Sequence, residues 1–304
     1  MSFIFAPAKL TLGFRVTGIR SDGYHLIESE MTMVNFGDDI EVVEVFDRTA
    51  GKRSHFEVMD PENMSKFGFG FRQVPTAEDN LLDKVASIFG KGLKARINKR
   101  IPVGGGLGGG SADGGALARL LWSAERELAG LSIEEMVTKL AKLGADLPVC
   151  FFGRRSYVSG IGEVLSFPDG PPPIALRKFT LFLAPISIST PAAYSAFDEG
   201  NRVTVASGEF QNDLEGPALA ISGRLRSFRE TIEKRFGVTP SLAGSGSTYF
   251  VSGHVLDQLL VEDLSKSSNA KGQQDGVRCM PFSDINDQAM SYLAWQCEEI
   301  ELNF

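Results

Sequence analysis

The chain has no apolar run long enough to cross a membrane as a helix, so its sequence predicts no transmembrane segment. Its first residues, MSFIFAPAKL, also lack the basic start and long apolar centre of a secretory signal peptide. Only three cysteines occur, Cys150, Cys279 and Cys297, and their odd number and wide spacing exclude a disulfide framework. Together these absences predict a cytoplasmic protein with buried, reduced thiols.

Excess positive charge is also missing from the sequence. The 31 Lys and Arg residues face 38 Asp and Glu residues, for a net charge of −7. The overall charge therefore favours neither nucleic acid nor an anionic membrane as a partner, and an anionic small molecule must be held by local charge or backbone N–H groups. With 304 residues, 43% of them hydrophobic, the chain is long enough for two lobes or one large domain.

One segment has a surplus of glycine and no cation. The run PVGGGLGGGSADGGA (102–116) holds eight glycines in fifteen residues, between an alternating strand pattern at 93–97 and a helical pattern that starts at Leu117. A helix start presents unpaired N–H groups and a partial positive charge, and glycines let a ligand approach the backbone closely. We therefore predict an anion site at 104–111, for which phosphate is the usual occupant.

A glycine-rich loop of this kind has three other interpretations. A Walker A loop requires Lys and then Ser or Thr after its last glycine, but here Ser-Ala-Asp follows, which excludes it. The glycine spacing at 104–109 also matches a dinucleotide fingerprint and hence an oxidoreductase. Glu125 or Glu127 would then bind the ribose, yet both fall inside the predicted helix. That interpretation and a surface loop without a ligand stay open at this point.

The apolar pattern predicts the remaining elements and one domain boundary. Lys9 opens the first strand on the face opposite its core residues, and Asp146 lies in a short turn before Pro148. No regular element is predicted between residues 47 and 76. The segment DGPPPI (169–174) is the best candidate for a boundary between lobes 1–168 and 169–304. The predicted elements are strands at 9–16, 31–34, 40–45 and 179–185, and helices at 79–89 (capped by Asp79 or Asn80), 133–143 (with a capping box at Ser132–Glu135 and an end at Gly144), 218–236 and 284–300.

Seven motifs in order give the sequence a family resemblance that spans residues 5 to 252. It resembles the GHMP small-molecule kinases, and among them those that phosphorylate a cytidine-diphosphate-linked methylerythritol in non-mevalonate isoprenoid precursor synthesis. The resemblance implies an α+β fold with an N-terminal ribosomal-protein-S5-like lobe and a C-terminal ferredoxin-like lobe. The motifs are PAKLTLGF (7–14), GYH (23–25), PVGGGLGGGSAD (102–113), LGADLPVCFFG (143–153), GIGE (160–163), NDLE (212–215) and LAGSGST (242–248).

The resemblance assigns the phosphate donor and the catalytic pair. It makes Asp146 the base that accepts the proton of the acceptor hydroxyl, and Lys9 the cation that neutralises charge on the γ-phosphoryl group. Mg²⁺ would be held mainly by ATP and water, with Ser111 near the phosphates or the ion, because spacing shows no acidic metal ligands. The resemblance places ATP over Pro102, Val103, Gly104, Gly105, Gly106, Leu107, Gly108, Gly109, Gly110, Ser111 and Ala112.

The resemblance also assigns the acceptor end of the site. Tyr24 and Tyr194 would stack on the cytosine and His25 would read its polar edge, although each is by itself an ordinary turn or core residue. Thr11 stands where the family usually has Asn, which leaves the acceptor contacts there open. Another GHMP alcohol kinase and a catalytically silent nucleotide-binding homologue remain alternatives, and the oligomeric state is not predicted. The residues assigned to the acceptor are Thr11, Tyr24, His25, Thr190, Tyr194, Gly244 and Gly246.

Overall fold

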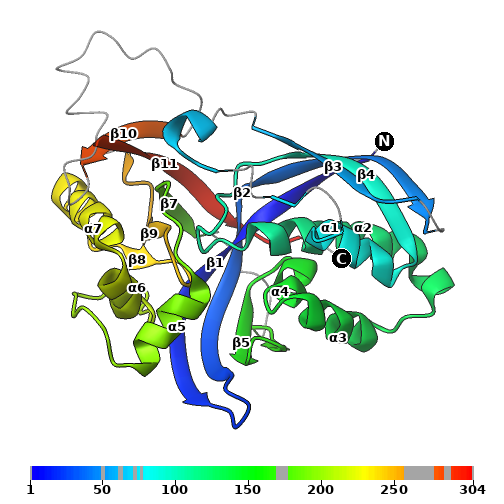
Figure 1. Cartoon of the computed structure of the whole chain (residues 1–304), viewed down its shortest axis with the longest axis horizontal. Helices are drawn as coiled ribbons and strands as arrows, with labels where there is room; N and C mark the ends of the chain where they lie inside the picture. The colour runs from blue at the N-terminus through cyan, green and yellow to red at the C-terminus, as the bar shows by residue number, and fades with distance from the viewer. Residues whose placement is uncertain are drawn as a thin grey trace.

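The chain has the α+β fold that the family resemblance implies (Figure 1). The computed structural model describes residues 2–48, 52–60, 64–70, 74–75, 78–168, 177–256, 277–283 and 289–302. Its strands are β1 (Ser2–Ile19), β2 (His25–Asp47), β3 (His55–Met59), β4 (Lys91–Asn98), β5 (Ser156–Gly160), β6 (Val164–Ser166), β7 (Lys178–Leu183), β8 (Ser241–Leu242), β9 (Tyr249–Ser252), β10 (Val277–Ser283) and β11 (Ala289–Ile300). Its α-helices are α1 (Leu81–Ile88), α2 (Gly109–Ala129), α3 (Ile133–Leu143), α4 (Leu147–Phe152), α5 (Thr190–Asp198), α6 (Glu215–Ile221) and α7 (Gly223–Phe236).

The first half of the chain is built around the long antiparallel pair β1 and β2. They pair from Ser2 opposite Val42 to Ile19 opposite His25, and β2 pairs further with β4 and β5. The predicted strands at 31–34 and 40–45 are therefore parts of one strand. Helices α1 to α4 pack beside this sheet (Figure 1). Residues 6–12 of β1 are all buried, so β1 carries its polar side chains into the interior rather than into solvent.

Several local predictions are confirmed by the structure. The Asn80 side chain accepts a hydrogen bond from the Leu82 N–H (2.9 Å) and caps α1. The capping box at the start of α3 is present, because Ser132 and Glu135 each accept a hydrogen bond from the backbone of the other. Cys150 and Cys297 are free, buried thiols, and burial raises the pKa of Cys150 to about 12. Each of these features depends on residues close together in sequence or on simple burial.

Residues 47–76, where the sequence pattern placed no regular element, contain β3 and a short 3-10 helix at Met64–Phe67, because β3 gains its hydrogen bonds from the parallel neighbour β4. One prediction within the interior of the chain is wrong. The single helix at 218–236 is two helices. Ser222 has an extended backbone (φ −138°, ψ 98°) that ends α6, and its hydroxyl caps α7 by accepting from the Leu225 N–H (3.2 Å).

The predicted C-terminal helix is also wrong, because residues 289–300 form strand β11. This strand pairs with β10 and β7, and its last residues reach β2, with Glu299 opposite Val34 and Ile300 opposite Met33. It thus connects the sheet of the second half with that of the first (Figure 1). Residues 284–288 of the prediction lie outside the described residues, as does the segment at 169–174, so the boundary between lobes stays a prediction.

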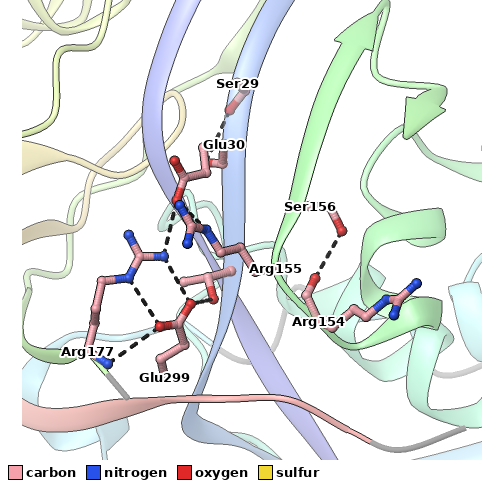
Figure 2. A network of polar contacts seen from close by, with 8 residues as sticks. Ser29, Glu30, Arg154, Arg155, Ser156, Arg177 and Glu299 are labelled. Atoms are coloured by element: carbon pink, nitrogen blue, oxygen red, sulfur yellow. Dashed lines mark hydrogen bonds and ion pairs between the residues drawn. The ribbon is translucent and has the colours of Figure 1, made fainter. Parts of the chain in front are cut away.

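A polar network fastens the end of β11 to β2, as Figure 2 shows. The Arg177 Nη2 atom donates to Glu299 (2.9 Å) and to Glu30 (3.1 Å), and Arg155 donates to Glu30 as well (2.8 Å). Glu299 is 1% exposed and also accepts from the Thr32 hydroxyl. The network holds the second half of the chain against the part of β2 that leads to the site described below. Among the described residues, no helix is long and apolar enough to cross a membrane.

Candidate active site

A cleft of about 790 Å³ joins both halves of the chain and contains most of the predicted site residues. Its volume is in the usual range for small-molecule sites. Thr11, Leu107 and Ala112 do not line it, since their side chains are buried in the interior. The predicted residues that do line it are Lys9, Tyr24, His25, Pro102, Val103, Gly104, Gly105, Gly106, Gly108, Gly109, Gly110, Ser111, Asp146, Thr190, Tyr194, Gly244 and Gly246.

The glycine loop is held by backbone contacts on two sides. Its Leu107 carbonyl accepts a hydrogen bond from the Lys9 N–H (3.2 Å), and its Gly105 carbonyl accepts one from the Thr248 N–H (3.0 Å). Gly106 has a φ of +79°, and a methyl group there would collide with the carbonyl oxygen of Ala243. Glycine is required at Gly106 because both the dihedral angle and the space exclude a side chain.

Helix α2 starts directly at the cleft. The Ala112 N–H donates to the Gly108 carbonyl (2.8 Å), so the N–H groups of the first three helical residues, 109–111, have no partner within the helix. These residues line the cleft. The geometry therefore supports the anion site that the sequence predicts, with unpaired donors and the positive end of a 21-residue helix facing one space.

Lys9 and Asp146 meet in this cleft although 137 positions separate them in the sequence. The Lys9 Nζ atom lies 3.3 Å from Asp146 Oδ2, and it also donates to the Thr11 hydroxyl (3.1 Å). Lys9 is 5% exposed, whereas the Asp146 side chain is 31% exposed. The ammonium group is thus oriented by two oxygens, and the carboxylate keeps an accessible side for a third molecule.

The position of Asp146 depends on α4, a helix that the sequence analysis did not predict. Asp146 precedes the first residue of α4, and its side chain makes no capping hydrogen bond, so the carboxylate is free to face Lys9. Helix α4 is pressed against α2 where Gly115 faces Cys150, since a methyl group at Gly115 would lie 2.6 Å from Cys150 Cβ. This close packing sets the direction from which Asp146 enters the cleft.

A buried charge cluster that the sequence analysis missed lies beside the start of α2. Lys99 Nζ donates to Asp113 (2.9 Å) and to Asp38, and all three side chains are at most 4% exposed. Burial raises the pKa of Asp113 to about 8 despite the adjacent ammonium group. Lys99 and Asp113 also line the cleft. Asp113 is the last residue of the glycine motif, and this position is the signal in the sequence that could have pointed to the cluster.

At the aromatic end of the cleft, Tyr194 stacks on His25, whereas the family resemblance implies that Tyr194 and Tyr24 stack on the cytosine. The His25 ring is stacked on Tyr194, with ring centroids 4.4 Å apart and an interplanar angle of 27°. Tyr24 is 59% exposed in the turn that connects β1 and β2. Tyr194 belongs to α5, so residues from both halves of the chain line this end of the cleft.

Two further residues from the second half support the site. Asn212 donates through its amide to the carbonyls of Leu242 (2.8 Å) and Gly244 (2.7 Å), which holds the loop that contains Gly244 and Gly246. Asp213 accepts a hydrogen bond from the Val16 N–H (2.9 Å) and thereby ties this segment to β1. The motif NDLE was recognised from the sequence, but no role could be read from it without the positions of these partners.

Comparison with known proteins identifies the family of this chain. The profile of the GHMP kinases N terminal domain matches residues 76–154. The 4-diphosphocytidyl-2-C-methyl-D-erythritol kinase of Cereibacter sphaeroides is 31% identical, over 82% of this chain and 88% of that protein. The enzyme of that name from Methylacidiphilum infernorum is 32% identical, over 88% of this chain and 91% of that protein.

Solved structures show the same fold. A crystal structure of 4-(cytidine 5'-diphospho)-2C-methyl-D-erythritol kinase matches 97% of this chain and 99% of that chain, with a TM-score of 0.61 and 22% identity. Methanococcus jannaschii mevalonate kinase matches 99% of this chain and 98% of that chain, with a TM-score of 0.51 and 13% identity. The chain therefore belongs to the GHMP kinases, which are ATP-dependent small-molecule kinases, and within them to the 4-diphosphocytidyl-2-C-methyl-D-erythritol kinase family.

Proposed function

We propose that this protein transfers the γ-phosphoryl group of ATP to a hydroxyl group of 4-diphosphocytidyl-2-C-methyl-D-erythritol. One observation carries the proposal: a single cleft contains the glycine loop, the Lys9–Asp146 pair and the aromatic group around His25. The names of the relatives supply the identity of the acceptor. We also propose that this reaction of isoprenoid precursor synthesis takes place in the cytoplasm.

In this proposal the glycine loop and α2 bind the triphosphate through backbone N–H groups. The acceptor hydroxyl loses its proton to Asp146 while its oxygen forms a bond to the γ-phosphorus atom. The bond between that phosphorus and the bridging oxygen breaks, and ADP leaves with the electron pair. Lys9, 3.3 Å from Asp146, neutralises charge that collects on the transferred group and keeps the carboxylate in place.

Thr11 has a different role from the one that its place in the motif suggests. Its hydroxyl is 3.1 Å from Lys9 Nζ and its side chain is 1% exposed, so it touches the catalytic lysine and does not line the cleft. We propose that Thr11 orients Lys9. The acceptor contacts that an Asn would make in the family must then come from other residues of the cleft.

The residues of the cleft fit an ATP-bound Mg²⁺ ion. Within the described residues, no group of three or more His, Cys, Asp or Glu side chains is placed to hold a metal ion. An ion carried by the phosphate oxygens and water needs few protein ligands. The Ser111 hydroxyl, in the first turn of α2, is the protein oxygen that we assign to it. When bound, Mg²⁺ would neutralise negative charge on the phosphates.

The test is ADP release measured with a panel of acceptors. The panel contains the cytidylyl-linked methylerythritol, mevalonate, homoserine and galactose, each assayed with wild-type protein and with Asp146→Asn as a matched control. We expect release with the cytidylyl-linked alcohol alone, and its loss in the variant. Release only with one of the other alcohols would overturn the acceptor and keep the kinase. No release with any acceptor would favour a silent nucleotide-binding homologue.

A further inference from the structure

We infer that Asp198 is a specificity-determining positioning residue, which holds the His25 ring so that Nδ1 faces the acceptor base as a hydrogen-bond acceptor. Such an atom selects a base with an exocyclic amine, as in cytosine, over one with a carbonyl at the same place, as in uracil. The inference rests on the proposed function, because it concerns the base of the proposed acceptor. Asp198 is not among the site residues predicted from the sequence.

The geometry fixes the His25 ring from one helix. His25 Nε2 is 2.7 Å from Asp198 Oδ1, and the ring is stacked on Tyr194 and edge-on to Phe197, whose centroid lies 6.3 Å away. The His25 side chain is 12% exposed. These contacts leave the ring one orientation, since three residues of α5 hold it by its edge and its face.

Three residues of α5 share one face of the helix. Thr190, Tyr194 and Asp198 are four positions apart, which places them one above the other on the helix surface. The Thr190 hydroxyl is 2.8 Å from that of Ser245, beside Gly244 and Gly246. Thr190 and Tyr194 line the cleft. Asp198 ends the same row of side chains one turn beyond Tyr194, and this position explains why it reaches His25.

The chemistry of the contact assigns the proton on the ring. An ionised carboxylate has only acceptor atoms, so the hydrogen bond to Asp198 requires a hydrogen on Nε2. A neutral imidazole carries one such hydrogen, and Nδ1 then has a lone pair. Among the described residues, His25 lines the cleft and no protein group pairs with Nδ1.

A lone pair at this place discriminates between pyrimidines. The exocyclic amine of cytosine donates to Nδ1, whereas the carbonyl oxygen of uracil would set two lone pairs against each other. Sites built to hydrogen-bond one substrate group can reject an analogue that lacks it by about 10⁴-fold or more when fully buried. We expect about 10²-fold here, because the Asp198 side chain is 42% exposed and solvent weakens the contact.

Glu199 offers a matched control for the carboxylate. It follows Asp198 directly, is exposed, and accepts a hydrogen bond from Ser195 on the same helix (3.0 Å), away from His25. Asp198→Asn keeps the size of the side chain, but its amide can either accept from Nε2 or donate to it. The ring then has no preferred tautomer. Asp198→Ala removes the contact altogether.

The experiment measures kcat and KM for the cytidine-diphosphate-linked acceptor and its uridine analogue, KM for ATP and the melting temperature. In Asp198→Asn and Asp198→Ala we expect the preference for cytidine to fall about tenfold and the acceptor KM to rise by a similar factor, with KM for ATP unchanged. Glu199→Gln should match wild type. An unchanged preference for cytidine, or equal effects in Glu199→Gln, would overturn the inference.

A second measurement separates this inference from the proposed function. Nitrogen-15 NMR of histidine-labelled protein, which contains only three histidines, reports the tautomer of His25 without any substrate. We expect the hydrogen on Nε2 in wild type and a mixed population in Asp198→Asn. A hydrogen on Nδ1 in wild type would refute the role of Asp198 while leaving the kinase intact. Failure of the cytidylyl acceptor in the panel would refute the proposed function while leaving the tautomer result in place.

Discussion

Replacing Gly106 by Ala tests how the glycine loop is held. Gly106 has a φ of +79°, and a methyl group there would collide with the Ala243 carbonyl oxygen. Real Cβ atoms essentially never lie so close to a neighbouring atom. Gly246 contributes a second carbonyl oxygen at 3.0 Å. Both neighbours are backbone atoms, which cannot rotate away. The loop and the 243–246 segment must therefore separate.

Gly106→Ala should lower both the stability of the fold and the rate of the reaction. A positive φ in a non-glycine residue costs about 1–2 kcal/mol of stability. Relief of the collision requires a shift on the order of 1 Å, and a misplacement of that size can cost about 10²-fold in rate. We expect kcat/KM for ATP to fall by about 10²-fold, which is about 2.7 kcal/mol of lost transition-state stabilisation.

Gly237→Ala separates the loss of stability from the loss of rate. Gly237 ends α7 with a φ of +66°, close to that of Gly106, but no atom lies within 4 Å of an added methyl group. Thermal unfolding and steady-state kinetics with ATP should show a similar strain penalty in both variants and the kinetic loss in Gly106→Ala alone. If kcat/KM for ATP stays within about twofold of wild type in Gly106→Ala, the loop does not depend on this packing.

The remaining predictions concern catalysis, the acceptor and pH. Asp146→Asn should keep ATP binding and lower kcat by about 10²–10⁴-fold, and near-normal turnover would exclude Asp146 as the base. Lys9→Ala should slow the chemical step, whereas a change confined to KM for ATP would contradict its assignment. Tyr24→Ala should raise the KM for the acceptor and leave the KM for ATP unchanged. The opposite pattern would contradict the assignment of Tyr24 to a cytosine pocket. The pKa of Asp113 is raised by burial to about 8, so the folded state holds a proton that the unfolded state has released. Its contribution to stability is therefore lost as pH rises between about 4 and 8, by up to about 1.4 kcal/mol per pH unit. Asp113→Asn should flatten this slope in thermal unfolding at pH 5 to 8, and an unchanged slope would mean that Asp113 does not titrate there.

Features that depend on neighbouring residues could be predicted from the sequence. The cap at Asn80, the capping box of α3 and the helix that follows the glycine loop each need only a few consecutive side chains. The anion site could be predicted for the same reason, since a loop of glycines before a helix places donors by local geometry alone. The pairing of Lys9 with Asp146 came from the family resemblance, because no local pattern connects them.

Features that depend on distant partners were decided by the tertiary structure. Residues 289–300 carry apolar spacing that suits a helix, but β10 and β7, and β2 at the last two residues, offer backbone hydrogen bonds that make them a strand. The Lys99 cluster and the contact of Asp198 with His25 likewise join residues from separate elements. The sequence by itself determined the glycine loop and helix start at which we propose that phosphate binds, because backbone donors at a helix start are a local property. Only the tertiary structure decided which carboxylates stand beside Lys99 and His25, because burial and hydrogen bonding there depend on side chains that folding brings together.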